Sequence, residues 1–272
     1  MERTFEELRQ HYEIEKELAN RLRGAPREER PVLYSQVYDE LFRRVPKHPQ
    51  LTKQNTALRQ SQLQGHIRLL RPHLTPDTVF LEVGAGDCAL PLLVAPMVRM
   101  AYGLDVSNEL IKGLPVSDRF QVLLAKGLEV PLPDESVDLV FSYQVMEHIH
   151  PDDVIDQLRD IYRVIKPGGS YYCITPNRLY GPHDISRGFD REATGLHLKE
   201  YTITDLLRLF RDAGFRQVWI ERMIKGHRCP FPVLPVRFLE SGLECLPWRI
   251  RTALARSFLM TRLLNASVMG RK

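Results

Sequence analysis

The stretch Val79-Phe-Leu-Glu-Val-Gly-Ala-Gly-Asp-Cys88 decides the fold, because an apolar run ends there in a Gly-x-Gly turn. A second apolar run ends at Tyr102-Gly-Leu-Asp105, which places the acid of Asp105 nineteen residues after Gly86. Glycines let the backbone approach a ligand closely, and an acid at the tip of the next strand accepts hydrogen bonds from ribose hydroxyls. The spacing therefore predicts an α/β sheet that holds a nucleoside.

Strand-like and helix-like patterns alternate along the chain on both sides of this stretch. The runs that read as strands are Val79–Val83, Met100–Asp105, Phe120–Ala125, Val137–Ser142, Ser170–Thr175 and Phe215–Met223. The helix-like runs include Asp152–Ile165, with Asp152 and Asp153 as N-terminal capping acids, and Thr204–Ala213, with Thr204 as its cap. Such alternation predicts a mainly parallel sheet that is covered by helices on both faces.

Size and composition describe an ordinary globular protein. The 272 residues are 43% hydrophobic and 26% charged, enough for one large domain with appendages. No run reaches the roughly 18 apolar residues of a membrane span, and the charged N-terminus does not read as a secretory signal. The cysteines lack CxxC spacing, so we expect no metal site and a cytoplasmic protein. The cysteines are Cys88, Cys173, Cys229 and Cys245.

Four segments follow from these patterns. Residues 1–72 read as an N-terminal helical extension, 73–224 as the nucleoside-binding core and 264–272 as the final strand of its sheet. Residues 225–263 read as an insert made of a Pro-rich loop and a basic amphipathic helix. From Arg222 to the end the chain has ten basic and two acidic residues, against a net charge of +4 for the whole chain. Such an insert is suited to cover the acceptor or to lie on an anionic membrane, although a helix packed on the domain explains it equally well.

The residues around the glycine turn favour one nucleoside cofactor over another. Gly84-Ala-Gly-Asp-Cys-Ala89 formally satisfies the dinucleotide pattern GxGxxA. Glu82, however, places a carboxylate at the strand tip, where a pyrophosphate would be repelled. A carboxylate there suits a cationic sulfonium. The sequence therefore favours a sulfonium nucleoside over a dinucleotide.

Five motifs in register resemble the class I S-adenosylmethionine-dependent methyltransferases, especially their small-molecule, ubiquinone-biosynthesis-like branch. The motifs are Glu82-Val-Gly-Ala-Gly-Asp87, Leu104-Asp105, Leu132-Pro-Asp-Glu-Ser-Val-Asp-Leu-Val140, Val145-Met-Glu-His-Ile149 and Arg163-Val-Ile-Lys-Pro-Gly-Gly-Ser170. The resemblance implies a Rossmann-like fold with a seven-stranded, mostly parallel sheet whose last strand is antiparallel. It also implies S-adenosyl-L-methionine as cofactor and S-adenosyl-L-homocysteine as product.

The resemblance assigns the donor site residue by residue. Glu82, Gly84, Ala85 and Gly86 would line the methionine part. Asp105 would bind the ribose diol. Val106, Gly127 and Leu128 would contact adenine, and Ser142, Tyr143 and Gln144 would close the site. Lys126 departs from the family, whose acid at this position accepts from the adenine amino group. Lysine cannot accept a hydrogen bond, so a backbone group would have to replace that contact.

An oxygen acceptor of high pKa needs a base, and histidine titrates nearest to neutral pH. His148 follows the fourth expected strand, and His197 lies in the polar segment 176–199, where the resemblance places acceptor contacts; we take both as catalytic candidates. Each could instead be structural or simply solvated. The sequence thus favours O-methylation of a small-molecule or lipid-linked acceptor. Its alternatives are a nucleic-acid methyltransferase, disfavoured because no RNA-binding signature accompanies the charge, and a catalytically silent binding module.

Overall fold

The computed structural model describes residues 3–51, 57–111, 113–114, 117–224 and 227–272. The first two residues of the expected N-terminal extension lie outside the described residues. So do residues 52–56 of the same extension and residues 225–226, where the insert was expected to begin.

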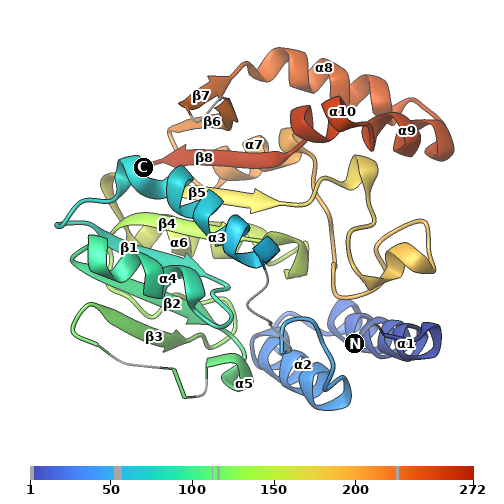
Figure 1. Cartoon of the computed structure of the whole chain (residues 1–272), viewed down its shortest axis with the longest axis horizontal. Coiled ribbons are helices and arrows are strands. Elements are labelled where there is room, and N and C mark those ends of the chain that lie inside the picture. Colours follow the sequence, from blue (N-terminus) through green and yellow to red (C-terminus); the bar gives the residue numbers. More distant parts are fainter. Residues whose placement is uncertain (1–2, 52–56, 112, 115–116, 225–226) are drawn as a thin grey trace.

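The centre of the molecule is a sheet of eight strands in the order β3-β2-β1-β4-β5-β8-β6-β7 (Figure 1). Strands β1 to β5 pair in parallel, β8 runs antiparallel between β5 and β6, and β7 pairs antiparallel with β6. The strands are β1 (Val79–Val83), β2 (Met100–Asp105), β3 (Phe120–Leu124), β4 (Val137–Tyr143), β5 (Ile165–Thr175), β6 (Gln217–Ile224), β7 (His227–Phe231) and β8 (Ala266–Arg271).

This sheet confirms the expected α/β, mostly parallel fold with an antiparallel last strand. The expected number of seven strands is wrong, because residues 227–231, assigned to a Pro-rich loop, continue from β6 as a hairpin. Proline is tolerated in β7 because this strand lies at the edge of the sheet and needs no second partner.

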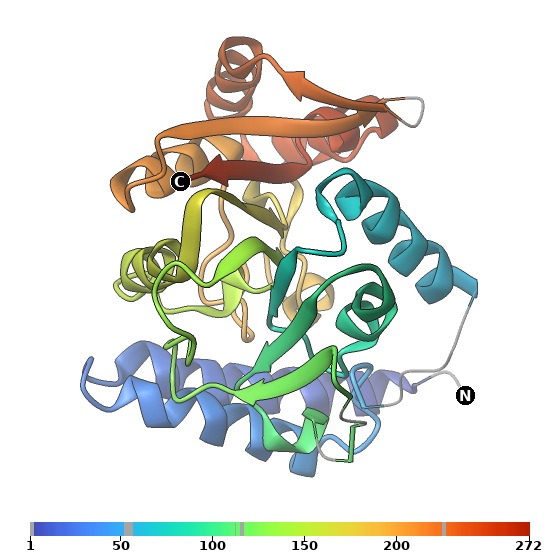
Figure 2. The same ribbon diagram turned by 90° about the vertical axis from the view of Figure 1, so that its left-hand side faces the viewer.

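Helices cover both faces of the sheet, as expected (Figure 2). On one face, α6 (Val154–Val164) and α7 (Ile203–Asp212) bury their apolar stripes against the strands. On the other face lie α3 (Ala57–Leu70) and α4 (Ala89–Val94). Strand β1 is buried along its whole length, as a central parallel strand between two helical layers must be.

Two expected helix caps are wrong. Helix α7 begins one residue earlier than expected, and Thr202 rather than Thr204 forms its capping box, with Asp205. Asp153 precedes α6, but its side chain makes no cap hydrogen bond. Its carboxylate instead accepts from Arg30 Nε and Nη2 at 2.7 and 2.6 Å, because a buried guanidinium is the stronger partner.

Arg30 belongs to the N-terminal helices, which pack together beside the carboxyl ends of β1 and β2. These are α1 (Phe5–Gly24) and α2 (Arg30–Arg44), and their buried faces share one hydrophobic cluster with Leu196 and Leu198. The bidentate Arg30–Asp153 pair therefore fixes α2 to the start of α6, beside the carboxyl ends of the parallel strands.

The basic C-terminal segment forms three helices where the sequence predicts one. They are α8 (Val233–Glu244), α9 (Trp248–Ala255) and α10 (Phe258–Leu263), and they lie together at the β6–β7 end of the sheet (Figure 1). In the described residues no helix combines the length and apolarity needed to span a membrane. The remaining short elements are α5 (Asn108–Ile111), η1 (Arg71–His73), η2 (Ala95–Met97), η3 (Met146–His148), η4 (Arg178–Tyr180) and η5 (Ile185–Gly188).

Candidate active site

The site lies where the sheet reverses its order, between β1 and β4. Chains leaving these two strands diverge to opposite faces, and the crevice left between them is where open α/β sheets bind ligands. Gly84 and Gly86 turn the chain after β1 with φ of 69° and 56°, in the left-handed region that favours glycine. A Cβ on Gly84 would come within 2.3 Å of Val145 Cγ2, so the loop after β4 requires glycine here.

Asp105 is the last residue of β2, and its side chain is hydrogen-bonded to the glycine turn. Its Oδ2 accepts from Gly86 N at 2.7 Å, and its Oδ1 accepts from Ser107 N at 3.0 Å. Each carboxylate oxygen can accept a further hydrogen bond, so the side chain can also bind a diol. Asp105 and Glu82 are both buried, at 9% and 7% exposure, and lie at neighbouring strands.

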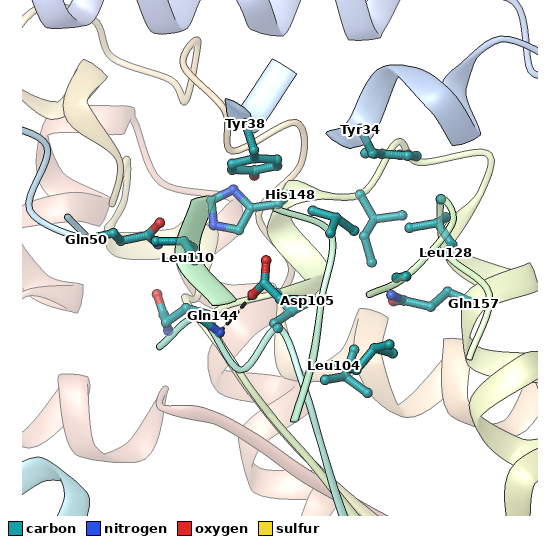
Figure 3. A pocket seen from close by; sticks show the side chains of 18 residues that line it. Tyr34, Tyr38, Gln50, Leu104, Asp105, Leu110, Leu128, Gln144, His148 and Gln157 are labelled. Atoms are coloured by element: carbon teal, nitrogen blue, oxygen red, sulfur yellow. Dashed lines mark hydrogen bonds between the residues drawn. The ribbon is translucent and has the colours of Figure 1, made fainter. Parts of the chain in front are cut away.

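The first of two cavities here has a volume of about 110 Å³ and is shown in Figure 3. Asp105 stands on one side, and the walls are mostly apolar. Tyr34 and Tyr38 reach into it from α2. The buried amide of Gln157 on α6 also lines it, with no side-chain hydrogen bond among the described residues. Its other apolar wall residues include Leu104, Val106, Leu110, Leu128 and Ile149.

A second, larger cavity of about 810 Å³ adjoins the first. Six residues line both cavities, so the two meet at the glycine turn. Glu82, Tyr143, His66 and His197 are among those that line only the larger one. The six shared residues are Tyr38, Gln50, Gly84, Gly86, Gln144 and His148.

The structure brings most of the predicted donor residues to these two cavities. Ser142 lines neither of them. It is fully buried, and its hydroxyl is hydrogen-bonded to that of Tyr171 at 2.7 Å. Lys126 is exposed and lines neither cavity. The residues that do line at least one cavity are Glu82, Gly84, Ala85, Gly86, Asp105, Val106, Gly127, Leu128, Tyr143 and Gln144.

His148 stands at the junction of the two cavities. Its Nδ1 donates to the carbonyl of Leu196 at 3.0 Å, which leaves the lone pair on Nε2. Burial, assisted by the neighbouring His197, lowers the pKa of His148 to about 3. The ring is therefore neutral near pH 7, and it is a weaker base than the sequence analysis expected, because a general base works best with a pKa near the operating pH.

His197 has a different environment. Its Nδ1 is hydrogen-bonded to Glu200 Oε1 at 2.8 Å, and its Nε2 lies 4.0 Å from Glu147 Oε1. Burial alone would lower the pKa of His197, but the two carboxylates outweigh burial and raise it. Glu147 is fully buried; Thr175 donates to its Oε2 at 2.7 Å, and no described residue forms a hydrogen bond with its Oε1.

These groups are also close enough to share one cation. Ligand atoms of Glu147, His148 and His197 all lie within 4.8 Å of one another. Imidazole and carboxylate are ligands that divalent metals accept. The expectation of no metal site stays a prediction.

Sequence reasoning missed Tyr34, Tyr38 and Gln157. The two tyrosines stand four residues apart, so they lie on one face of α2, and this spacing is the only signal that pointed to them. Nothing in the sequence around Gln157 distinguishes it from other polar positions of an amphipathic helix.

An α/β sheet with a glycine turn at its switch point and an acid at the end of the next strand defines a nucleoside-binding domain of the Rossmann type. Residues 81–173 match the model of the family described as Methyltransferase domain. Residues 81–173 therefore form a class I S-adenosylmethionine-dependent methyltransferase domain, and the cofactor of such domains is S-adenosylmethionine.

Two relatives and one solved structure give the range of similar proteins. A probable S-adenosylmethionine-dependent methyltransferase of Mycolicibacterium smegmatis is 32% identical over 136 residues, 50% of this chain and 51% of the relative. The tRNA N(3)-cytidine methyltransferase METTL6 of Homo sapiens is 32% identical over 155 residues, 50% of this chain and 53% of the relative. The chain thus spans about half the length of these relatives.

The [4+2]-cyclase SpnF shares the fold, with a TM-score of 0.57 and 19% identity over 88% of this chain and 96% of that one. That protein is named as a cyclase, so sharing this fold does not by itself establish methyl transfer. The human relative is named for a tRNA substrate, so the relatives do not support the expectation that disfavoured nucleic acid.

Proposed function

We propose that the chain transfers a methyl group from S-adenosylmethionine to an oxygen of a small-molecule or lipid-linked acceptor. The observation that supports this most directly is the pair of adjoining cavities that meet at Gly84 and Gly86. The smaller cavity combines apolar walls with Asp105, as a nucleoside requires. The larger one contains Glu82 and enough volume for a second reactant.

The residues fit the cofactor. Asp105 would accept from the ribose hydroxyls, and the apolar walls with the Gln157 amide would hold adenine. Glu82 would hold the cationic end of the methionine part. When bound, the cofactor supplies an electrophilic methyl group, so the protein needs chiefly to align an acceptor and exclude water. Alignment of this kind contributes up to roughly 7–11 kcal/mol in favourable systems.

His148 is placed to orient the acceptor. Its Nε2 lone pair, at the junction of the cavities, accepts a hydrogen bond from an acceptor hydroxyl and so directs an oxygen lone pair toward the donor side. The carbonyl of Leu196 keeps the imidazole in the required tautomer. The acceptor hydroxyl would lose its proton as its oxygen bonds to the methyl group. His197, whose pKa its carboxylate partners raise, is the more basic of the two rings and would take that proton.

Lipid-linked acceptors are favoured by the C-terminal helices. Six of the exposed large hydrophobic side chains lie on or between Leu234 and Leu259, alongside exposed arginines. A surface of this composition suits contact with an anionic membrane. This contact is part of the proposal.

The donor site is tested with Asp105→Asn and Glu82→Gln, which keep side-chain size. We expect each to weaken binding of S-adenosylhomocysteine at least about tenfold by calorimetry, because each removes a charge from a buried ligand contact. Lys126→Ala is the matched control and should bind like wild type. Unchanged affinity in both acid variants, or no binding by the wild type at millimolar ligand, contradicts a working donor site.

The acceptor class is tested by incubating the chain with methyl-labelled donor and three substrate pools: total lipid, polar small molecules and total tRNA. We expect label in the lipid or small-molecule pool, and a loss of roughly a hundredfold in rate for His148→Phe with unchanged donor affinity. Label confined to tRNA would instead support the nucleic-acid function that the human relative suggests.

A further inference from the structure

A separate cavity lies between α3, α10 and the sheet, away from the candidate active site. Its volume is about 720 Å³, and among the described residues it shares no lining residue with the other two cavities. Apolar side chains from four elements form much of its wall, and one buried arginine stands among them. These residues are Leu69, Ile174, Phe231, Leu263 and Arg222.

The Arg222 guanidinium uses only part of its hydrogen-bonding capacity. Its Nη1 donates to Glu221 O at 3.0 Å and to Ser267 O at 3.5 Å, and its Nη2 donates to Leu263 O at 3.1 Å. A guanidinium has five N–H donors, so Nε–H and one N–H of Nη2 remain. Nε is buried and has no hydrogen-bond partner in the part of the chain that the structure describes.

The charge of Arg222 also lacks a close counter-ion. The residue is 8% exposed, and among the described residues no carboxylate oxygen lies within 4.0 Å of it. The carboxylate of Glu240 interacts with the Arg222 charge only from a longer distance, and burial lowers the pKa of Arg222. Arginine nevertheless stays protonated in proteins, and a buried cation is costly unless it is paired. The buried side chain of Glu221 also lines the cavity, and its Oε2 accepts from Trp219 Nε1 at 2.6 Å. The Arg222 guanidinium therefore has no directly paired carboxylate among the described residues.

The two unused donors match an anion in geometry. Arg30 uses the same two nitrogens, Nε and Nη2, to hold both oxygens of Asp153 at 2.7 and 2.6 Å. Planar, bidentate contact of this kind is the arrangement in which arginine binds carboxylate and phosphate groups. In Arg222 this edge of the guanidinium has no such partner.

We propose that this cavity binds an anionic amphiphile, with a phosphate or carboxylate on Nε and Nη2 of Arg222 and an apolar chain along Leu69, Ile174 and Leu263. Phe231 lies over the guanidinium, with 5.9 Å from the Arg222 Cζ to the ring centroid. Nε is shielded from solvent, so binding requires a small shift of the surrounding side chains. Arg262, an exposed residue of α10, also lines the cavity and adds a second positive charge.

The test is a calorimetric titration of the full chain with dodecyl phosphate below its micelle concentration. Inorganic phosphate and dodecyl maltoside serve as probes of the head group and of the chain alone. We expect one dodecyl phosphate per chain, with both other probes at least about tenfold weaker. Arg222→Met should weaken dodecyl phosphate binding about ten- to a hundredfold, because it removes a charged hydrogen-bond donor. Arg222→Lys keeps the positive charge but lacks the two parallel N–H donors of the guanidinium, so it should lose less affinity for dodecyl phosphate than Arg222→Met.

Arg208→Met is the matched control, since the Arg208 side chain is 84% exposed on α7. Binding of S-adenosylhomocysteine should be the same in all three variants, which separates this site from the donor site. The proposal is overturned if Arg222→Met and Arg222→Lys both bind dodecyl phosphate like wild type. It is also overturned if inorganic phosphate or dodecyl maltoside binds as tightly as dodecyl phosphate.

Discussion

Which side chains point into the donor cavity decides which group can bind the adenine amino group. Lys126 occupies the position where the family's acid contacts adenine, yet it is exposed and does not line the cavity. Gln157 lines the cavity from α6, and its amide is buried without a side-chain partner among the described residues. An amide oxygen can accept from an adenine amino group, which a lysine cannot do.

We therefore predict that Gln157→Leu weakens S-adenosylhomocysteine binding by about tenfold, the cost of one buried hydrogen bond of about 1–1.5 kcal/mol. The measurement is calorimetry with S-adenosylhomocysteine and with S-inosylhomocysteine, which has a carbonyl in place of the amino group. The variant should discriminate less between the two ligands than wild type does. An equal loss for both ligands would show that Gln157 acts only through packing.

The site residues at the carboxyl ends of strands could be predicted from the sequence. The site residues that lie on helices could not. Glu82, Gly84 and Asp105 follow directly from where two apolar runs end. Ser142 and Tyr143 show the limit of this reasoning, because successive strand residues point to opposite faces. Tyr143 lines the larger cavity, whereas Ser142 points to Tyr171 inside the core.

At the level of elements, one ion pair joins helices that are more than a hundred residues apart in sequence. Arg30 of α2 and Asp153 at the start of α6 are both buried, and Tyr34 adds a hydrogen bond to Asp153 at 3.0 Å. Tyr34 also lines the donor cavity. The pair thus fixes the helix that closes the nucleoside site, and no local sequence pattern could reveal a contact over this separation.

We predict that Arg30→Met lowers the free energy of unfolding by roughly 3 kcal/mol, because it leaves the Asp153 carboxylate buried without its cation. Urea unfolding of wild type, Arg30→Met, Asp153→Asn and the double variant measures this loss and the coupling between the two residues. Additive effects in this cycle would contradict a direct interaction. Arg9→Met, on the exposed face of α1, is the control and should change stability little.

The same pair predicts a dependence on pH. Burial alone would raise the pKa of Asp153, but hydrogen bonds from Arg30 and Tyr34 outweigh burial and lower it. Its stabilisation is then complete above the unfolded-state pKa of about 3.9 and is lost as the pH falls through the lower folded-state value. The difference in unfolding free energy between wild type and Arg30→Met should be constant from pH 7 to 5 and shrink below about pH 4. A difference that already shrinks between pH 7 and 6 would point to another group.

At the scale of the whole molecule, the order of elements was predictable and the C-terminal end was not. Strands β1 to β5 can be recognised in the sequence as apolar runs between turn residues. Because they alternate with helices, few sheet topologies are possible. In contrast, His227–Phe231 contains proline and charge, so its pairing with β6 depends on the hairpin itself. The basic segment after it divides into three helices at Pro247 and Ser257.

Those three helices lie together at one end of the molecule (Figure 1), and each of them exposes large apolar side chains, which together we call the apolar surface of these helices. Its members, each 48–77% exposed, are Leu234 and Phe238 on α8, Ile250 and Leu254 on α9, and Phe258 and Leu259 on α10. Exposed arginines stand among them at 237, 249, 256 and 262. Glu244, the exposed acid of these helices, is paired with Arg178. Exposed apolar side chains beside exposed arginines are suited to the interface of an anionic bilayer.

We predict that the full chain sediments with vesicles of phosphatidylcholine and phosphatidylglycerol, and much less with phosphatidylcholine alone. Each arginine near an anionic surface contributes about 1 kcal/mol, and this contribution falls as salt shortens the Debye length. Raising the salt should therefore release the chain. Phe238→Ser with Phe258→Ser should weaken binding at least about tenfold, since each ring loses roughly 1.5–3 kcal/mol of apolar burial. Leu58→Ser, on α3 and 82% exposed, is the matched control. If the control loses as much as the double variant, or if neutral vesicles bind equally well, this surface does not contact the membrane.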